Sequence, residues 1–165
     1  MQAWADRLGR RDRLRVGLVW SGNPRHMNDR NRSIPLKTLT KVLDIDAAFI
    51  SLQKEPRPED RATLAATAIL DLTAELTNFV ETAALVSCLD LVITVDTSVA
   101  HLAAALGRPT WILLPFAPDY RWLLDRDDSP WYPTARLFRQ TKACDYASVV
   151  DRVRVELAAL VATKN

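Results

Sequence analysis

Histidine and cysteine are scarce in this sequence of 165 residues, which contains two of each. Cys88 and Cys144 lie far apart and form no Cys-x-x-Cys or Cys/His group. With only His26 and His101 besides, we expect no structural zinc site and no other metal centre. We interpret both cysteines as small residues of the core type in a protein kept in a reducing compartment.

Long apolar segments are also missing. No run approaches the roughly 20 residues that a membrane helix needs. The first residues carry arginine and aspartate instead of the apolar stretch of a secretory signal. We therefore expect no membrane span and a soluble, cytoplasmic protein. With 48% hydrophobic and 25% charged residues, the composition is typical of one globular domain.

The overall excess of positive charge is small, because the net charge is only +2. An excess of this size does not indicate a nucleic-acid partner. Its distribution is uneven, however, since residues 1–32 hold eight arginines against three aspartates. The arginines between residues 7 and 15 are typical of a solvated terminal helix. The later cluster of Arg25, Arg30 and Arg32 follows a predicted strand and indicates an anionic ligand.

Short apolar, β-branched runs alternate with helical patterns from residue 15 onwards. The runs predict strands at 15–20, 48–52, 69–72, 91–95, 110–114 and 136–138. Helices are predicted from about residue 35, at 59–66, after a capping box of Asn78 and Glu81, at 97–106, and after Asp145. The alternation predicts an α/β fold, a Rossmann-like parallel sheet of about six strands with helices on both faces. We expect residues 15–165 to form this domain and residues 1–14 to form a linker helix.

The turn at residues 95–101, Val-Asp-Thr-Ser-Val-Ala-His, leaves the end of a strand that is nearly all apolar. At such a strand end, the following helix points free N–H groups and the positive end of its dipole at a crevice, where anions bind. Thr97 or Ser98 can cap the helix or donate a hydroxyl to a phosphate, and His101 is near enough to reach the same anion. A plain helix cap beside a buried polar histidine is the alternative.

A serine-hydrolase site at this turn is not supported. Asp96, Ser98 and His101 lie too close together on one turn to form a relay. The sequence around Ser98 also lacks the Gly-x-Ser-x-Gly elbow that would expose a nucleophile.

Residues 95–110 resemble the signature of glycosyltransferase family 9, the heptosyltransferases, in their C-terminal nucleotide-sugar-binding domain. That signature reads Asp-[Thr/Ser]-Gly-x-x-His-x-Ala-Ala-Ala-x-Gly-x-Pro. The matching positions are Asp96, Thr97, His101, the alanine run, Gly107 and Pro109. Ser98 stands where the family has glycine. Its side chain can narrow the approach of a diphosphate, or its hydroxyl can replace one backbone contact.

The chain from about residue 15 resembles more closely the glycosyltransferase-like domains that follow tetratricopeptide repeats in bacterial proteins. The resemblance lies in Trp-Ser-Gly-Asn-Pro at 20–24, Asp-Arg-Asn-Arg-Ser at 29–33, Ser-Leu-Gln at 51–53, Pro-Asp-Tyr-Arg-Trp at 118–122 and Ser-Pro-Trp-Tyr-Pro at 129–133.

The resemblance implies one half of an inverting GT-B glycosyltransferase that uses a nucleotide diphosphate sugar and needs no metal or other cofactor. It implies that Thr97, Ser98, His101 and a loop arginine stabilise the leaving diphosphate. The general base is expected in an N-terminal half, so we expect no catalytic residue in this chain and no turnover by the chain alone. The expected partners are the donor and an N-terminal acceptor domain or tetratricopeptide-repeat region.

The loop at residues 21–33 is expected to face the same crevice as Asp96, because both follow strands of one parallel sheet. Gly22 permits a tight turn, and Asn23 belongs to the resembled segment. His26 and the arginines at 25, 30 and 32 bring positive charge where a diphosphate would lie. The resembled family places a basic residue after this strand. A solvated, mobile loop is the alternative.

Lys54 and Glu55 follow the second predicted strand, also at the edge of the crevice. An acidic residue at this place commonly accepts hydrogen bonds from ribose hydroxyls, so Glu55 is the candidate. The alternative is an exposed loop that the two nearby prolines stiffen.

The segment at residues 116–133 is too long for a plain connection, and long ordered loops are usually functional. It holds five aromatic residues and Arg121, a combination that can stack on a base or a sugar. The aromatics can equally form the loop's own core or meet a partner domain. For Trp122 and Trp131 we favour packing within the loop, and the role of Arg121 is left open.

A second hypothesis is a non-catalytic nucleotide-binding or protein-interaction module that has kept the fold and lost the transferase activity. Its support is Ser98 in place of glycine, together with the divergence from the family in the loop after the fifth strand.

Overall fold

The computed structural model describes residues 2–164 and confirms the predicted parallel sheet. Six strands lie in the order β3-β2-β1-β4-β5-β6, and every neighbouring pair is parallel. They are β1 (Leu14–Val19), β2 (Ala47–Ser51), β3 (Leu70–Asp71), β4 (Leu91–Val95), β5 (Thr110–Leu114) and β6 (Ala135–Arg139). The strand order reverses between β1 and β4, and ligands of open α/β sheets bind at the carboxyl ends of such strands.

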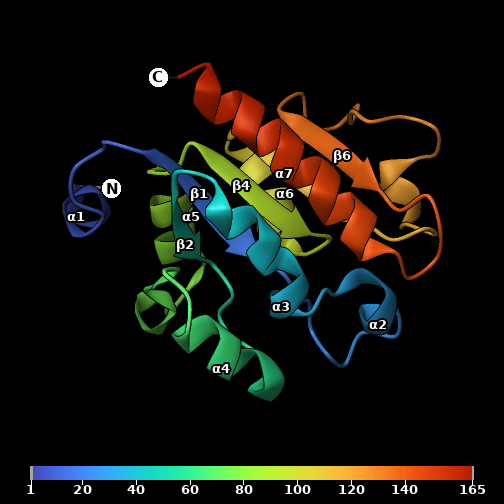
Figure 1. Ribbon diagram of the computed structural model, residues 1–165, viewed down its shortest axis with the longest axis horizontal. Helices are drawn as coiled ribbons and strands as arrows, with labels where there is room; N and C mark the ends of the chain where they lie inside the picture. The colour runs from blue at the N-terminus through green and yellow to red at the C-terminus, as the bar shows by residue number, and fades with distance from the viewer. Residues whose placement is uncertain (1, 165) are drawn as a thin grey trace.

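Helices cover both faces of the sheet, as Figure 1 shows, with α3 and α7 on one face and α5 and α6 on the other. The α-helices are α1 (Gln2–Arg7), α2 (Asp29–Arg32), α3 (Leu36–Leu39), α4 (Pro58–Ala65), α5 (Phe79–Val86), α6 (Ser98–Ala105) and α7 (Tyr146–Ala162). Short 3-10 helices span Thr40–Asp44, Thr73–Glu75 and Tyr120–Trp122. Between residues 2 and 164, no helix combines the length and the apolar character that crossing a membrane requires.

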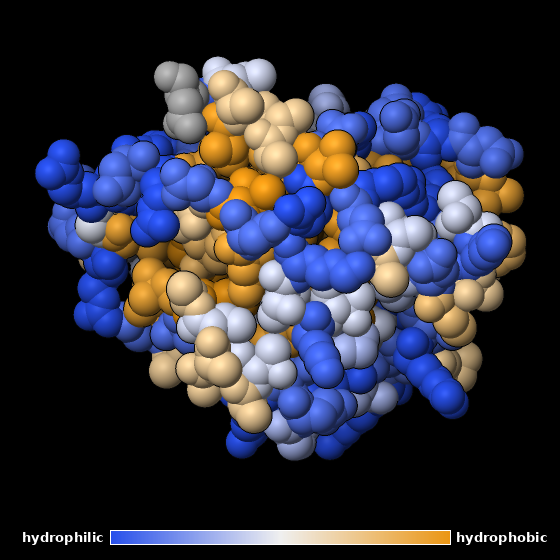
Figure 2. Space-filling view, viewed as in Figure 1, coloured by the Kyte–Doolittle hydropathy of each residue, from blue (hydrophilic) through white to orange (hydrophobic). Residues whose placement is uncertain are grey.

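The central strands are buried because they are apolar on both faces. Every residue of β1, β4 and β5 is buried, as expected for parallel strands between two layers of helices. On one face, Val16 belongs to a cluster with Leu36 of α3 and Val149 of α7. On the other, Val92 packs with Leu85 of α5. Figure 2 shows the α3 and α7 face from outside, where hydrophilic residues border apolar ones that reach the surface beside the last turns of α7.

Most of the predicted helix ends are confirmed. The Asn78 side chain accepts a hydrogen bond from the Glu81 N–H at 3.0 Å, Asp145 caps α7, and Gly107 follows α6 with a φ of 69°. The capping box is only half formed, because the Glu81 carboxylate accepts instead from Nε1 of the buried Trp4 at 2.8 Å. This contact joins α1 to α5.

Three predictions from the sequence are wrong in detail. β3 has two residues instead of four, and both are exposed, because it is an edge strand that pairs only with β2. The helix from residue 35 ends at Leu39 and continues as a 3-10 helix. Cys144 is exposed in the loop before α7, with a φ of 61°, so it is not a core residue. Cys88 is partly buried against the core, as expected.

Candidate functional site

One side chain, that of Gln53, holds together the loops that follow β1 and β2. Its Oε1 accepts hydrogen bonds from the N–H groups of Trp20 and Ser21, at 3.2 and 2.9 Å. The fully buried indole of Trp20 donates from Nε1 to Asp60 Oδ2 at 3.0 Å, which ties the same loop to α4. The first residues after β1 are therefore fixed in place.

A buried carboxylate, that of Asp29, organises the far end of the same loop. Asp29 is 5% exposed and accepts hydrogen bonds from Ser33 Oγ at 2.8 Å and from the guanidinium of Arg57. The Nε atom of Arg32 lies 3.6 Å from Asp29 Oδ1. These contacts hold helix α2 and its C-cap residue Ser33 together.

Arg32 reaches from α2 to the turn after β4. Its Nη1 donates to the backbone oxygen of Asp96 at 3.0 Å, and its side chain is 13% exposed. Gly22 leaves the space for it, since a Cβ atom at this position would lie 2.5 Å from Arg32 Nη2. The tight turn expected of Gly22 is thus also a close approach between backbone and guanidinium.

The turn after β4 leaves the N-terminus of α6 open. Thr97 is the N-cap residue, but its side chain makes no capping hydrogen bond within the described helix. Its Oγ1 lies 3.3 Å from Thr94 Oγ1 instead, and Ser98 is exposed. The first amide groups of α6 and the positive end of its dipole therefore remain available to an anion.

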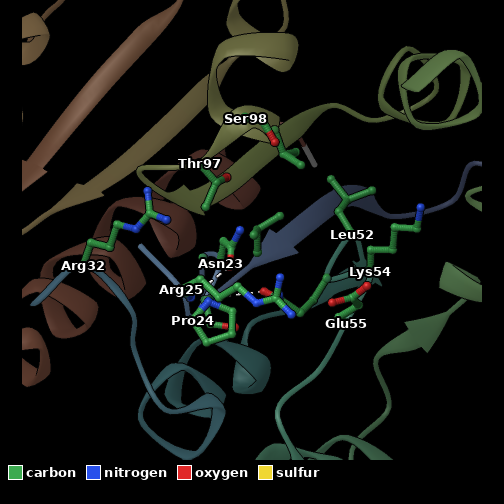
Figure 3. Close-up of a pocket in the computed structure, with 14 residues that line it drawn as sticks. Asn23, Pro24, Arg25, Arg32, Leu52, Lys54, Glu55, Thr97 and Ser98 are labelled. Atoms are coloured by element: carbon green, nitrogen blue, oxygen red, sulfur yellow. Dashed lines mark hydrogen bonds between the residues drawn. The ribbon is translucent and has the colours of Figure 1, made fainter. Parts of the chain in front are cut away.

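A cavity of about 800 Å³, here the first cavity, lies at the carboxyl ends of β1, β2 and β4 (Figure 3). In Figure 3, Arg25 extends across it toward the side of Lys54 and Glu55, and Thr97 and Ser98 lie on the opposite side. The sequence-predicted residues that line it are Gly22, Asn23, Arg25, Arg32, Lys54, Glu55, Thr97 and Ser98. Three of these are cations and one is a carboxylate, so the lining carries an excess of positive charge.

His101 is not part of this lining and belongs to an aromatic group instead. Its ring stacks on the buried Trp122 with centroids 5.2 Å apart, and Nδ1 lies 3.0 Å from the hydroxyl of Tyr132. Its Nε2 lies 3.8 Å from Asp96 Oδ1. Burial lowers the pKa of His101 below its ordinary value, and the nearby Asp96 opposes that shift only in part. The ring is consequently neutral at pH 7.

Asp96 contacts both Arg32 of the first cavity and His101 of the aromatic group. Two of the predicted arginines, Arg30 and Arg121, lie outside the first cavity. The backbone oxygen of Asp96 receives Arg32, and its carboxylate lies toward His101. Arg30 lines a separate cavity, here the second cavity, beside the segments that follow β5 and β6. Arg121 forms an ion pair with Asp119 at 2.8 Å, and half of its side chain is exposed.

The two tryptophans of the long aromatic loop have opposite environments. Trp122 is 1% exposed and lies beside Tyr132 of its own loop, but it also packs against the small residues Ala100 and Ala104 of α6, which the prediction of packing within the loop did not include. Trp131 is 67% exposed, so the prediction that it packs within the loop is wrong. Its neighbour Tyr132 takes the inward position and contacts His101.

The residues that hold the first cavity together were not identified as such from the sequence. Gln53, Asp29 and Arg57 act through contacts between separate loops, and no local pattern marks such contacts. The available signal was weak: Gln53 and Asp29 both belong to the segments that carry the family resemblance.

The lining of the first cavity suits an anion rather than a metal ion. Within residues 2–164, no three His, Cys, Asp or Glu side chains come together in a group that could hold a metal. Arginine, lysine and free amide groups are instead the donors that proteins use for phosphate.

Comparison with known proteins finds similarity to one family over part of the chain. Residues 49–115 match the family described as glycosyltransferase family 9 (heptosyltransferase). This stretch runs from within β2 to just after β5 and includes the turn at 95–101. No curated protein sequence matches the chain.

Two solved structures share the fold. The ADP-heptose lipopolysaccharide heptosyltransferase II of E. coli superposes with a TM-score of 0.66 at 18% identity, over 99% of this chain and 51% of that one. A glycosyl transferase of family 9 from Veillonella parvula DSM 2008 gives a TM-score of 0.63 at 14% identity, over 99% and 50%. The chain therefore spans about half the length of these proteins. It has a Rossmann-like fold similar to that of family 9 heptosyltransferase domains.

Proposed function

We propose that the first cavity binds the nucleoside diphosphate of a nucleotide sugar, and that the chain is the donor half of a heptosyltransferase-like glycosyltransferase. The observation that carries this proposal is the uncapped N-terminus of α6, which borders the same cavity as Arg25, Arg32 and Lys54. The family match and the named activity of the E. coli structure support the choice of a nucleotide sugar.

The diphosphate is expected at the start of α6. Backbone N–H groups of the first turn and the hydroxyls of Thr97 and Ser98 supply donors on one side. Arg25 supplies charge from the other side and forms no ion pair with any described residue. Arg32 is already bonded to Asp96 O, so it contributes mainly a fixed positive charge. His101 lies beyond Asp96 and would meet the part of the donor that extends past the diphosphate.

Glu55 is the proposed contact for the ribose. It lines the first cavity next to Lys54, at the end of β2, where an acidic residue can accept hydrogen bonds from both ribose hydroxyls. Leu52, which lies near Lys54 in Figure 3, and Val19 also line the cavity and give it apolar surface suited to a base.

The chemistry supplied by this half is stabilisation of the leaving group. As the bond from sugar to diphosphate breaks, negative charge grows on the phosphate oxygens, and preorganised amides and guanidinium groups stabilise it. Deprotonation of the acceptor is assigned to a general base on an N-terminal acceptor domain or repeat region. The chain alone is therefore expected to bind the nucleotide and to turn over nothing.

A titration followed by ¹⁵N NMR tests the proposal. ADP, UDP or GDP is expected to shift the amides of residues 96–101 at millimolar concentration, and Arg25→Ala should weaken that binding about tenfold. Arg30→Ala is the matched control, because this arginine belongs to the same loop but lines the second cavity. If none of the three nucleotides shifts these amides, the first cavity is not a nucleotide site.

A non-catalytic interaction module is the second candidate, and Ser98 is the observation that favours it. Its side chain lies at the N-terminus of α6, at a position where the signature of family 9 has glycine (Figure 3). If this side chain blocks the diphosphate, Ser98→Gly will convert a chain that does not bind nucleotide into one that does. If the hydroxyl replaces a backbone contact, Ser98→Gly will weaken binding instead.

A further inference from the structure

The imidazole of His101 is oriented by three neighbours, two of which come from the long loop after β5. Its ring stacks on Trp122, with centroids 5.2 Å apart and planes inclined by 19°. Its Nδ1 atom lies 3.0 Å from the hydroxyl oxygen of Tyr132, and its Nε2 atom lies 3.8 Å from Asp96 Oδ1. The stacking fixes the plane of the ring, so the two polar neighbours decide what each nitrogen can do.

The ring of His101 carries a single proton at neutral pH. Burial lowers its pKa, and this is the largest influence on the ring. Of the charged residues that act on it, Asp96 and Asp119 raise the pKa and Arg121 lowers it. A neutral imidazole has one N–H that donates and one bare nitrogen that accepts, so the chemistry of His101 depends on which nitrogen holds the proton.

The neighbours of the two nitrogens assign that proton. A carboxylate can only accept a hydrogen bond, so a bare Nε2 would turn its lone pair toward the like-charged oxygen of Asp96. A phenol can donate as well as accept, so the Tyr132 hydroxyl suits a bare Nδ1. Both nitrogens therefore face a compatible neighbour when Nε2 is protonated and Tyr132 donates to Nδ1.

The position of the Tyr132 hydroxyl is set by the loop and not by His101. Pro130 and Pro133 restrict the backbone on either side of the Trp-Tyr pair. The carbonyl oxygen of Tyr132 accepts from the N–H of Ala135, the first residue of β6, at 3.0 Å. The loop thus presents the hydroxyl to the imidazole from a backbone that is anchored to the sheet.

We propose that Tyr132 is a positioning residue, whose hydroxyl donates to Nδ1 of His101 and so directs the single proton of the ring to Nε2. The distance of 3.8 Å between Nε2 and Asp96 Oδ1 exceeds the length of a hydrogen bond, so this N–H is not committed to Asp96. It is a neutral donor for a ligand bound at the start of α6, where the other tautomer would present a lone pair. The role in ligand binding rests on the proposed function, whereas the assignment of the tautomer does not.

A long-range ¹H–¹⁵N NMR spectrum of the ligand-free chain at neutral pH reads the tautomer directly. We expect the resonances of His101 to show a protonated Nε2 and a bare, hydrogen-bonded Nδ1. Tyr132→Phe should move the Nδ1 resonance toward that of a nitrogen without a hydrogen bond. Tyr120→Phe is the matched control, because Tyr120 belongs to the same loop but is 82% exposed, and it should leave the spectrum of His101 unchanged.

Calorimetry with ADP-glucose, UDP-glucose and GDP-mannose tests the consequence for binding. Tyr132→Phe should raise the Kd of the tightest of the three roughly threefold, and Tyr120→Phe should not change it. In a His101→Gln background, the side-chain amide keeps an N–H donor and has no tautomers, so Tyr132→Phe should no longer affect the Kd. An equal loss in both backgrounds would show that Tyr132 does not act through His101.

The two proposals can fail separately. A proton on Nδ1 in the unchanged chain, or an Nδ1 resonance that Tyr132→Phe does not move, would overturn this inference even if the nucleotide sugars bind. If none of the three nucleotide sugars binds while the ligand-free spectrum shows a protonated Nε2 and a hydrogen bond to Tyr132, the proposed function of the first cavity fails and the assignment of the tautomer holds.

Discussion

The two cavities share one edge of the sheet, but they differ in their chemistry. The first combines a helix N-terminus with Arg25, Arg32 and Lys54, whereas the second has several apolar residues, the neutral groups of Gln140 and Tyr146, and one cation, Arg30. Arg32 lines the first cavity and is hydrogen-bonded to Asp96, and both residues act electrostatically on Tyr146 of the second. The difference shows how one edge can hold both a charged and a neutral part of a ligand, because each loop brings its own side chains to a common line of strand ends.

A second comparison is between the first cavity and the aromatic group of His101, Trp122 and Tyr132, which lines neither cavity. Hydrogen bonds to buried carboxylates and to Gln53 fix the loops of the first cavity, whereas ring packing fixes the aromatic group. Substitutions can test whether the hydrogen bonds and the aromatic packing contribute differently to the free energy of unfolding.

The largest effect is expected on the aromatic side. Trp122→Ala removes a fully buried indole and should lower the free energy of unfolding by about 3–5 kcal/mol. Trp131→Ala, in the same loop but largely exposed, should change it by no more than about 0.5 kcal/mol. Urea denaturation measures both. Equal losses would show that the aromatic loop is not divided into a buried and an exposed part.

A smaller loss is expected where a carboxylate holds the first cavity. Asp29→Asn weakens the charged contact with Arg57, which is itself partly exposed, so we expect a loss of about 2 kcal/mol. Asp46→Asn is the control, because Asp46 is 74% exposed and lies 3.9 Å from Arg13. Asp29→Asn should also weaken nucleotide binding, measured by calorimetry. Unchanged affinity would mean that α2 does not position Arg32.

Gly22→Ala tests the close approach between backbone and guanidinium. The new Cβ would displace Arg32 and cost about 1–2 kcal/mol of stability. In an Arg32→Ala background the same substitution should cost much less, because the clashing group is gone. Thermal unfolding of the four proteins completes the cycle. Additive effects would contradict the contact.

The smallest effect is the pH dependence that His101 contributes. Burial places its folded pKa below the unfolded value of about 6.5, so the unfolded chain takes up the proton first as pH falls. This part of the stability is complete above about pH 6.5 and decreases below it. Denaturation between pH 5 and 8 should therefore show a steeper acid loss for the unchanged chain than for His101→Gln. If an NMR titration gave the imidazole a pKa at or above its ordinary value, that result would contradict the burial of the ring.

Much of the fold follows from short patterns in the sequence. The apolar run at 91–95 predicted β4, the Gly107 and Pro109 pair predicted the end of α6, and Asn78 predicted the start of α5. Each of these signals depends on residues a few positions apart. A buried parallel strand gives a strong signal, because nearly all of its residues are apolar. The short edge strand β3 was overestimated because its length depends on its single neighbour, β2.

The residues of the candidate site could also be predicted only in part. The sequence placed Thr97 and Ser98 at a helix N-terminus and Arg25 in a loop after a strand, and the structure brings all three to the first cavity. It could not separate Arg30 from Arg32, although they are two residues apart and line different cavities. Helix α2 turns their side chains in different directions.

By itself, the sequence determined the order of strands and helices and the open turn at 95–101, because both arise from local periodicity and backbone preference. Only the tertiary structure decided that Gln53 and Asp29 hold the loops, that His101 stacks on Trp122 apart from the first cavity, and that Gln140 and Tyr146 are left without partners within residues 2–164. These features depend on contacts between residues distant in the chain, and no local pattern specifies which distant groups will meet.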